Sequence, residues 1–121
     1  MAGTLTISTL SDGTNSTSAT NCVKGSAQAW VNFDGNGSTS IRSSFNVSSV
    51  TYDTTGTYTV NFTTAFSDAN YAIAACGSAV NTYWCFLTRA NNPPTTTSCQ
   101  FQSSYGTSKQ NEVYNSIVFF R

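Results

Sequence analysis

The chain has 121 residues, enough for one domain with its own core. Only 8% of the residues are charged, five basic and five acidic side chains cancel, and histidine is absent. Nucleic-acid binding needs clustered Lys and Arg, and spanning a bilayer needs roughly 20 consecutive apolar residues, so we expect neither a nucleic-acid partner nor a membrane span. Because nearly uncharged proteins associate readily, the composition favours a subunit of an assembly over a hydroxyl-rich monomer.

Residues 1–24 are predicted to form an extended N-terminal arm or linker. The segment TLTIS is compatible with one strand, whereas SDGTNSTSATN is polar and rich in turn residues, with little apolar area to bury. The start of the chain lacks the basic residues and apolar stretch of a secretory signal. We therefore expect a protein made in a cytosol, with reduced cysteines, whose arm becomes ordered by docking on a partner.

Residues 25–121 carry the pattern of an all-β, jelly-roll-like antiparallel β-sandwich of about eight or nine strands. Apolar residues alternate in short runs between turn signals, and no segment shows a helical period. The segment AQAWVNF places four apolar residues on one face: Ala27, Ala29, Val31 and Phe33. Trp30 lies on the other, polar face of this strand. The DGNG sequence that follows predicts a hairpin turn.

The next two segments continue the alternation. IRSSFNV is predicted to direct three residues into the core: Ile41, Phe45 and Val47. TYTVNF is the clearest strand, and its inward residues are Tyr58, Val60 and Phe62. A DTTG turn separates the two segments, and an SDAN turn follows the second.

Three later segments, YAIAACG, YWCFL and SIVFF, are apolar on both faces. A sandwich strand normally shows one face to the core and one to water. The second apolar face therefore needs a cover, either the N-terminal arm or another copy of the chain. We favour another copy and predict a homotrimer, with Trp30, Phe119 and Phe120 at the interface.

The connecting loops supply the candidate binding residues. NNPP must be a loop because proline cannot donate to a sheet ladder, and YGTSKQNE is predicted to be a longer loop after the strand SCQFQS. Aromatic rings and amides suit contact with sugars or protein. The predicted binding residues are Tyr83, Trp84, Asn91, Asn92 and Tyr105. For Trp84, as for Trp30, packing in a core or subunit interface is favoured over ligand binding, whereas for Tyr105 both interpretations stay open.

The sequence offers little for catalysis. Without histidine, the Ser-His-Asp and Cys-His arrangements are excluded. The acidic residues are Asp12, Asp34, Asp53, Asp68 and Glu112, and the four aspartates lie in turn signals rather than in a facing pair. The cysteines form no CxxC motif, and DGNG lacks the later ligands of a calcium loop. We expect no enzyme activity, no metal and no cofactor.

The spacing of the four cysteines leaves one pairing open. Cys85 and Cys99 could face each other on neighbouring strands, although buried free thiols are favoured.

Four motifs occur in order: residues 24–35 (KGSAQAWVNFDG), 41–49 (IRSSFNVSS), 56–62 (GTYTVNF) and 68–71 (DANY). Together they resemble a module of tail-fibre and other virion proteins of bacteriophages, many of them marine or cyanobacterial. The resemblance implies a β-sandwich tip, commonly homotrimeric, that binds a host surface or another virion protein. It implies no catalytic residues.

These observations predict a phage structural protein located in the virion. The first hypothesis is a tail-fibre or tail-tip module whose partners are its own copies, other virion proteins bound through residues 1–24, and a host-surface glycan or protein. The alternative is a capsid decoration protein, which the shortness of the chain and its arm would suit. A glycan-degrading enzyme is the third and least favoured hypothesis.

Overall fold

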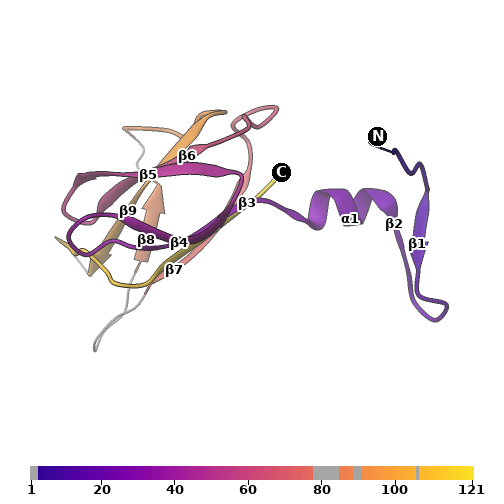
Figure 1. Cartoon of the computed structure of the whole chain (residues 1–121), viewed down its shortest axis with the longest axis horizontal. Coiled ribbons are helices and arrows are strands. Elements are labelled where there is room, and N and C mark those ends of the chain that lie inside the picture. The colour runs from indigo at the N-terminus through magenta and orange to yellow at the C-terminus, as the bar shows by residue number, and fades with distance from the viewer. Residues whose placement is uncertain (1–2, 78–84, 89–90, 106) are drawn as a thin grey trace.

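The computed structural model describes residues 3–77, 85–88, 91–105 and 107–121, without the side chains of residues 85–88 and 105. The chain is all-β in its main body, where two antiparallel sheets face each other (Figure 1). The strands of this sandwich are β3 (Ala27–Asp34), β4 (Ser40–Phe45), β5 (Val47–Thr54), β6 (Thr57–Phe62), β7 (Ala72–Gly77), β8 (Cys85–Thr88), β9 (Ser98–Tyr105), β10 (Ser108–Lys109) and β11 (Asn115–Phe120). The predicted all-β sandwich is confirmed.

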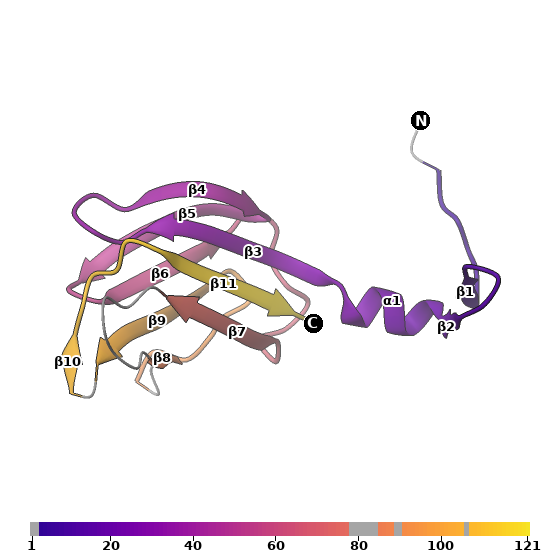
Figure 2. The ribbon, with the colours of Figure 1, turned by 90° about the horizontal axis from the view of Figure 1, so that it is seen from below.

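The described strands of the sandwich divide into a four-stranded and a five-stranded sheet. The first has the order β4-β3-β11-β7, and the second has the order β10-β9-β6-β5 with β8 also paired to β9. In the first sheet, β3 and β11 are neighbours, so the beginning and the end of the sandwich lie side by side (Figure 2). This pairing joins two strands that are separated by almost the whole sequence of the domain.

Alternate side chains of the strands point into the space between the two sheets and fill it. The predicted inward residues of β6 and, apart from the half-buried Ala27, those of β3 are buried. Phe33 and Tyr58 are 0% exposed and pack edge to face at 5.2 Å. From β11, Phe119 packs edge to face on Phe62 at 5.0 Å. Edge-to-face contacts between aromatic rings contribute about 0.5–1.5 kcal/mol beyond the area they bury.

The chain crosses from one sheet to the other at Asn46, which has a positive φ of 55°. Asparagine tolerates this left-handed conformation better than most residues. The turn sets Phe45, the last residue of β4, opposite Trp30 on the outer side of the sheet. The prediction that Phe45 points into the core is therefore wrong, since it is 54% exposed, and Ile41 is likewise 37% exposed beside a β-bulge. Val47 is buried as predicted.

One end of the sandwich is held by a buried polar cluster. The Tyr58 hydroxyl donates to the Gly35 carbonyl at 2.9 Å and lies 3.0 Å from Asn111 Oδ1, which also accepts from the backbone amide of Gly56 at 2.7 Å. Gly56 has a φ of 62°, and a Cβ there would lie 2.5 Å from the Ser103 carbonyl oxygen. The loop after β10 is thus tied to the β5–β6 turn through the Asn111 side chain.

The N-terminal arm has more structure than predicted. A hairpin of β1 (Thr9–Ser11) and β2 (Ser16–Ser18) leads into helix α1 (Ala19–Gly25), although no helix was expected. The local reason is capping, because Ser18 accepts a hydrogen bond from the backbone amide of Asn21 at 3.2 Å. Asp12 closes the hairpin turn by accepting from the amides of Thr14 and Asn15, and these bonds lower the pKa of its carboxyl group.

Candidate interaction surfaces

The outer face of the four-stranded sheet carries an apolar row that crosses all four strands. The register places Phe45 of β4 opposite Trp30 of β3, Trp30 opposite Val118 of β11, and Val118 opposite Ala74 of β7. Residues that face each other across a ladder lie on the same side of a sheet. Trp30 and Phe45 are 36% and 54% exposed. This row is therefore apolar and partly open to solvent.

Two more residues extend this row. Phe120 of β11 lies opposite Ala72 of β7, and both lie on the outer side because Phe119 and Ile73 point inward. We define the outer patch by these residues: Phe45, Trp30, Val118, Ala74, Phe120 and Ala72. Beside the outer patch, on the same face of the sheet, lies a polar row in which Asn32 donates to Ser116 Oγ at 2.7 Å. The outer patch thus has a defined polar border.

The outer face of the five-stranded sheet has the opposite character. Asn61 donates to the hydroxyl groups of Ser49 and Thr51 at 3.0 and 3.1 Å. Asp53 accepts from Thr59 Oγ1 at 2.7 Å and from Gln100 Nε2 at 2.8 Å. These hydroxyl, amide and carboxylate groups make this face polar, so it is well suited to contact with water. The two outer faces of the sandwich are therefore chemically distinct.

A charged group stands at the rim of the four-stranded sheet. Arg42 pairs with Asp34 at 2.9 Å, donates to the Val113 carbonyl at 2.6 Å, and stacks over the Tyr114 ring at 4.5 Å. The three contacts fix the guanidinium group against its own chain. Cation–π contacts at exposed sites contribute about 0.5–1 kcal/mol, so this cluster orders the rim of the sheet.

The arm carries a second uncovered apolar surface. Leu5, Ile7, Leu10 and Val23 are 81%, 39%, 53% and 66% exposed. With Ala19 and Cys22 they surround one open hollow of about 370 Å³ between the hairpin and α1. We call these four large side chains the arm face. The arm was expected to have little apolar area, but folding of the hairpin against α1 gathers what it has on one side.

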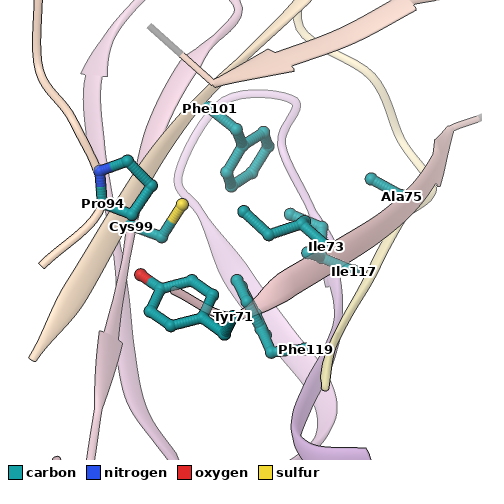
Figure 3. Close-up of a pocket in the computed structure, with 8 residues that line it drawn as sticks. All are labelled: Tyr71, Ile73, Ala75, Pro94, Cys99, Phe101, Ile117 and Phe119. Atoms are coloured by element: carbon teal, nitrogen blue, oxygen red, sulfur yellow. The ribbon is translucent and has the colours of Figure 1, made fainter. Parts of the chain in front are cut away.

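Between the two sheets lies a cavity of about 500 Å³ (Figure 3). Its lining residues are Tyr71, Ile73, Ala75, Pro94, Cys99, Phe101, Ile117 and Phe119. Burial raises the pKa of the Cys99 thiol to about 11, and it also raises the pKa of Tyr71. The Tyr71 hydroxyl already donates to the carbonyls of Thr95 and Ser98. Most of the lining side chains are therefore apolar, and the Tyr71 hydroxyl is engaged by the protein itself.

The predicted binding residues are not brought together by the described part of the structure. Tyr83 and Trp84 lie outside the described residues. Asn91 and Asn92 are exposed in the loop before β9, as predicted. Tyr105 is the last residue of β9 rather than part of a loop, because β9 continues to pair with β8 and β10.

The structure places the predicted interface residues in different environments. Trp30 and Phe120 lie on the outer patch, whereas Phe119 is 0% exposed within a single chain and contacts Phe62 and Tyr71. Phe119 is therefore a core residue, and its assignment to the interface was wrong. The physical reason is alternation, since only one of two consecutive strand residues can face outward.

Sequence reasoning missed Phe45 and the arm face. The exposure of Phe45 follows from the crossing at Asn46, and the only sequence signal for it is that an Asn follows the Phe. The apolar spacing of Leu5, Ile7 and Leu10 was visible, but its gathering with Val23 depends on α1.

The cysteines do not form the pairing that was left open. Cys85 lies opposite Ser104 in the β8–β9 ladder, while Cys99 lies opposite Val60. Cys99 is a buried free thiol, and Cys22 and Cys76 are also free.

Acidic groups are dispersed over the described residues. Asp12, Asp34 and Asp68 accept hydrogen bonds from nearby backbone amides, as expected for turn residues. Within these residues no group of three or more His, Cys, Asp or Glu side chains could hold a metal ion, and none of the helices is long and apolar enough to cross a membrane. Comparisons with protein-family models, curated proteins and solved structures give no match.

Proposed function

We propose that the chain is a non-catalytic structural subunit of a bacteriophage particle, and that it assembles as a homotrimer. The observation that carries this proposal is the outer patch, an apolar sheet face left open on a sandwich that already has its own core. Large open apolar patches mark sites of protein–protein contact. The arm face is a second surface of the same kind on the same chain.

The phage part of the proposal is supported by the sequence motifs, because they coincide with defining elements of the fold. Residues 24–35 include β3, and residues 41–49 include the crossing at Asn46. Residues 56–62 include Gly56 and the strand β6, and residues 68–71 form the turn before β7. The resemblance to tail-fibre and other virion modules therefore extends over the architecture rather than over one strand.

Within a particle, a tail-fibre or tail-tip module that contacts the host surface is our first assignment. Asn91 and Asn92 on an exposed loop are its described candidate contacts. Labelled protein should bind cells in a panel of marine bacterial and cyanobacterial isolates, and Asn91→Ala with Asn92→Ala should weaken binding without changing thermal stability. Thr14→Ala on the arm is the matched surface control. Failure to bind any isolate would contradict the adhesive role.

A capsid decoration protein is the second candidate, and the projecting arm favours it because an apolar arm suits docking on a shell. Copy number separates the two roles, since a decoration protein is abundant and a tail-tip protein scarce. Quantitative mass spectrometry of purified particles measures this ratio directly.

The homotrimer itself is tested by light scattering during size-exclusion chromatography. We expect a species of three times the 12.9 kDa chain mass at micromolar concentration. A monomer under these conditions would contradict self-association.

A further inference from the structure

The arm face and the outer patch, both exposed and apolar, lie on either side of a short junction in the chain. Helix α1 ends at Gly25, and β3, which carries Trp30 at the centre of the outer patch, begins at Ala27. In Figures 1 and 2 the arm continues beyond the start of β3 and away from both sheets. The arm face therefore does not cover the outer patch of its own chain.

The arm needs an external surface to be stable. Helix α1 has seven residues, none of them buried, and each strand of the hairpin has three. Isolated helices shorter than about 12–15 residues are marginal in water, and so are isolated hairpins. Because the arm face remains largely exposed, packing within the arm does not supply the missing stabilisation. A docking surface must supply it.

The outer patch has the matching chemistry. The charged residues of the arm are Asp12, in the hairpin turn, and Lys24, and neither belongs to the arm face. The outer patch is also free of charge, so bringing the two surfaces together buries no unpaired ion. The opposite outer face of the sandwich is lined by hydroxyls, amides and Asp53, and burying it under apolar side chains would be unfavourable.

We infer that the arm of one copy docks on the outer patch of the next copy. Leu5, Ile7, Leu10 and Val23 then cover the aromatic centre of the patch, Trp30 and Phe45. This contact is head to tail, and such contacts form closed rings when the rotation between copies closes. The inference rests on the proposed self-association and specifies which two surfaces make it, in place of sheet-to-sheet or arm-to-arm contact.

Two double variants of the full chain remove one surface each. The arm variant is Leu10→Ser with Val23→Ser, and the patch variant is Trp30→Thr with Phe45→Thr. Neither removes a core residue of the sandwich, so both should keep the circular dichroism signal of its β-sheets, whereas the undocked arm should lose its helix and hairpin. We expect both to be monomers at concentrations where the parent is a trimer. The controls Thr14→Ala on the arm and Thr51→Ala on the polar face should stay trimeric.

Mixing the two variants gives the decisive result. The arm variant keeps an intact patch, and the patch variant keeps an intact arm, so the mixture should form a one-to-one heterodimer although each variant alone is monomeric. A trimeric arm variant would mean that sheets pack together, and a trimeric patch variant would mean that arms associate. Either result, or the absence of a heterodimer, overturns arm exchange while leaving self-association in place.

Fluorescence tests the same contact without disrupting the patch. The chain has two tryptophans, and Trp84→Phe leaves Trp30 as the reporter. Its emission should shift to longer wavelength when the trimer is diluted and dissociates, and Leu10→Ser with Val23→Ser should give the shifted emission at every concentration. Emission independent of both changes would overturn the inference. A parent chain that is monomeric at all concentrations would instead refute self-association itself.

Discussion

Asn46 and Thr64 are joined by two hydrogen bonds that run in opposite directions. The Thr64 amide donates to Asn46 Oδ1 at 2.8 Å, and Asn46 Nδ2 donates to the Thr64 carbonyl at 3.2 Å. Asn46 Nδ2 also donates to the Gln28 carbonyl at 3.1 Å. One side chain in a left-handed turn thus connects β3, the crossing between the sheets, and the segment after β6.

Replacement of Asn46 should separate its conformational role at positive φ from the contribution of its side-chain hydrogen bonds. Asn46→Gly keeps the positive φ and loses the side-chain bonds, so we expect the free energy of unfolding to fall by about 1–3 kcal/mol. Asn46→Ala should lose about 1–2 kcal/mol more, because alanine is strained at positive φ. Urea denaturation measures both. Ser43→Ala on the exposed part of β4 is the control, and equal losses for Gly and Ala would contradict a conformational role.

Removal of the Tyr58 hydroxyl should weaken the end of the sandwich. Tyr58→Phe leaves the buried Gly35 carbonyl without this donor, and we expect a loss of about 1–3 kcal/mol in the free energy of unfolding. Ser43→Ala is the control, because it removes a hydroxyl group from an exposed residue of β4 outside this cluster. Its loss should stay within about 0.5 kcal/mol. Equal losses in thermal or urea unfolding would refute the polar cluster.

Phe119 and Phe120 are adjacent but should respond differently to truncation. Phe119→Ala removes a fully buried ring, so we expect a loss of about 3–5 kcal/mol in stability. Phe120→Ala should affect subunit association more than the stability of the monomer. Unfolding at low protein concentration and the dissociation constant of the trimer measure the two effects. Comparable destabilisation of the monomer by both variants would contradict their assignment to opposite faces.

Stability should fall at alkaline pH. Burial raises the pKa of Cys99 from 9.0 to about 11 and the pKa of Tyr58 from 10.0 to about 12. Between the pKa of each group in the unfolded chain and its raised pKa in the folded chain, the folded chain holds a proton that the unfolded chain has lost. The free energy of unfolding therefore decreases as pH rises. This contribution is complete below pH 9.0 and is lost progressively up to about pH 12.

Urea denaturation at pH 7 and pH 10.5 checks this loss. Cys99→Ala should reduce the difference in unfolding free energy between the two pH values, because it removes one of the titrating groups. Ile73→Val, at the same cavity, is the control that perturbs packing alone, and it should lower stability by about 0.5–1.5 kcal/mol at both pH values. A pH dependence unchanged by Cys99→Ala would mean that its thiol does not contribute.

Much of the fold could be predicted from alternation, because a pleated strand sends successive side chains to opposite sides. Tyr58, Val60 and Phe62 were assigned to the core on this basis, and the structure buries all three. The turns were predictable too, since Gly37 and Gly56 adopt the positive φ that their DGNG and DTTG sequences favour. These features depend on residues close together in the chain, so the sequence alone determined them.

The remaining features depended on contacts between distant segments. In SIVFF both faces are apolar, and only the placement of the second sheet decided that Phe119 belongs to the core and Phe120 to the outer side. Phe45 faces outward because the chain changes sheets at the next residue, and the outer patch exists because pairing aligns it with Trp30 and Val118. Alternation defines two faces of a strand, but burial of one of them is a property of what packs against it, and that is fixed only in the folded molecule.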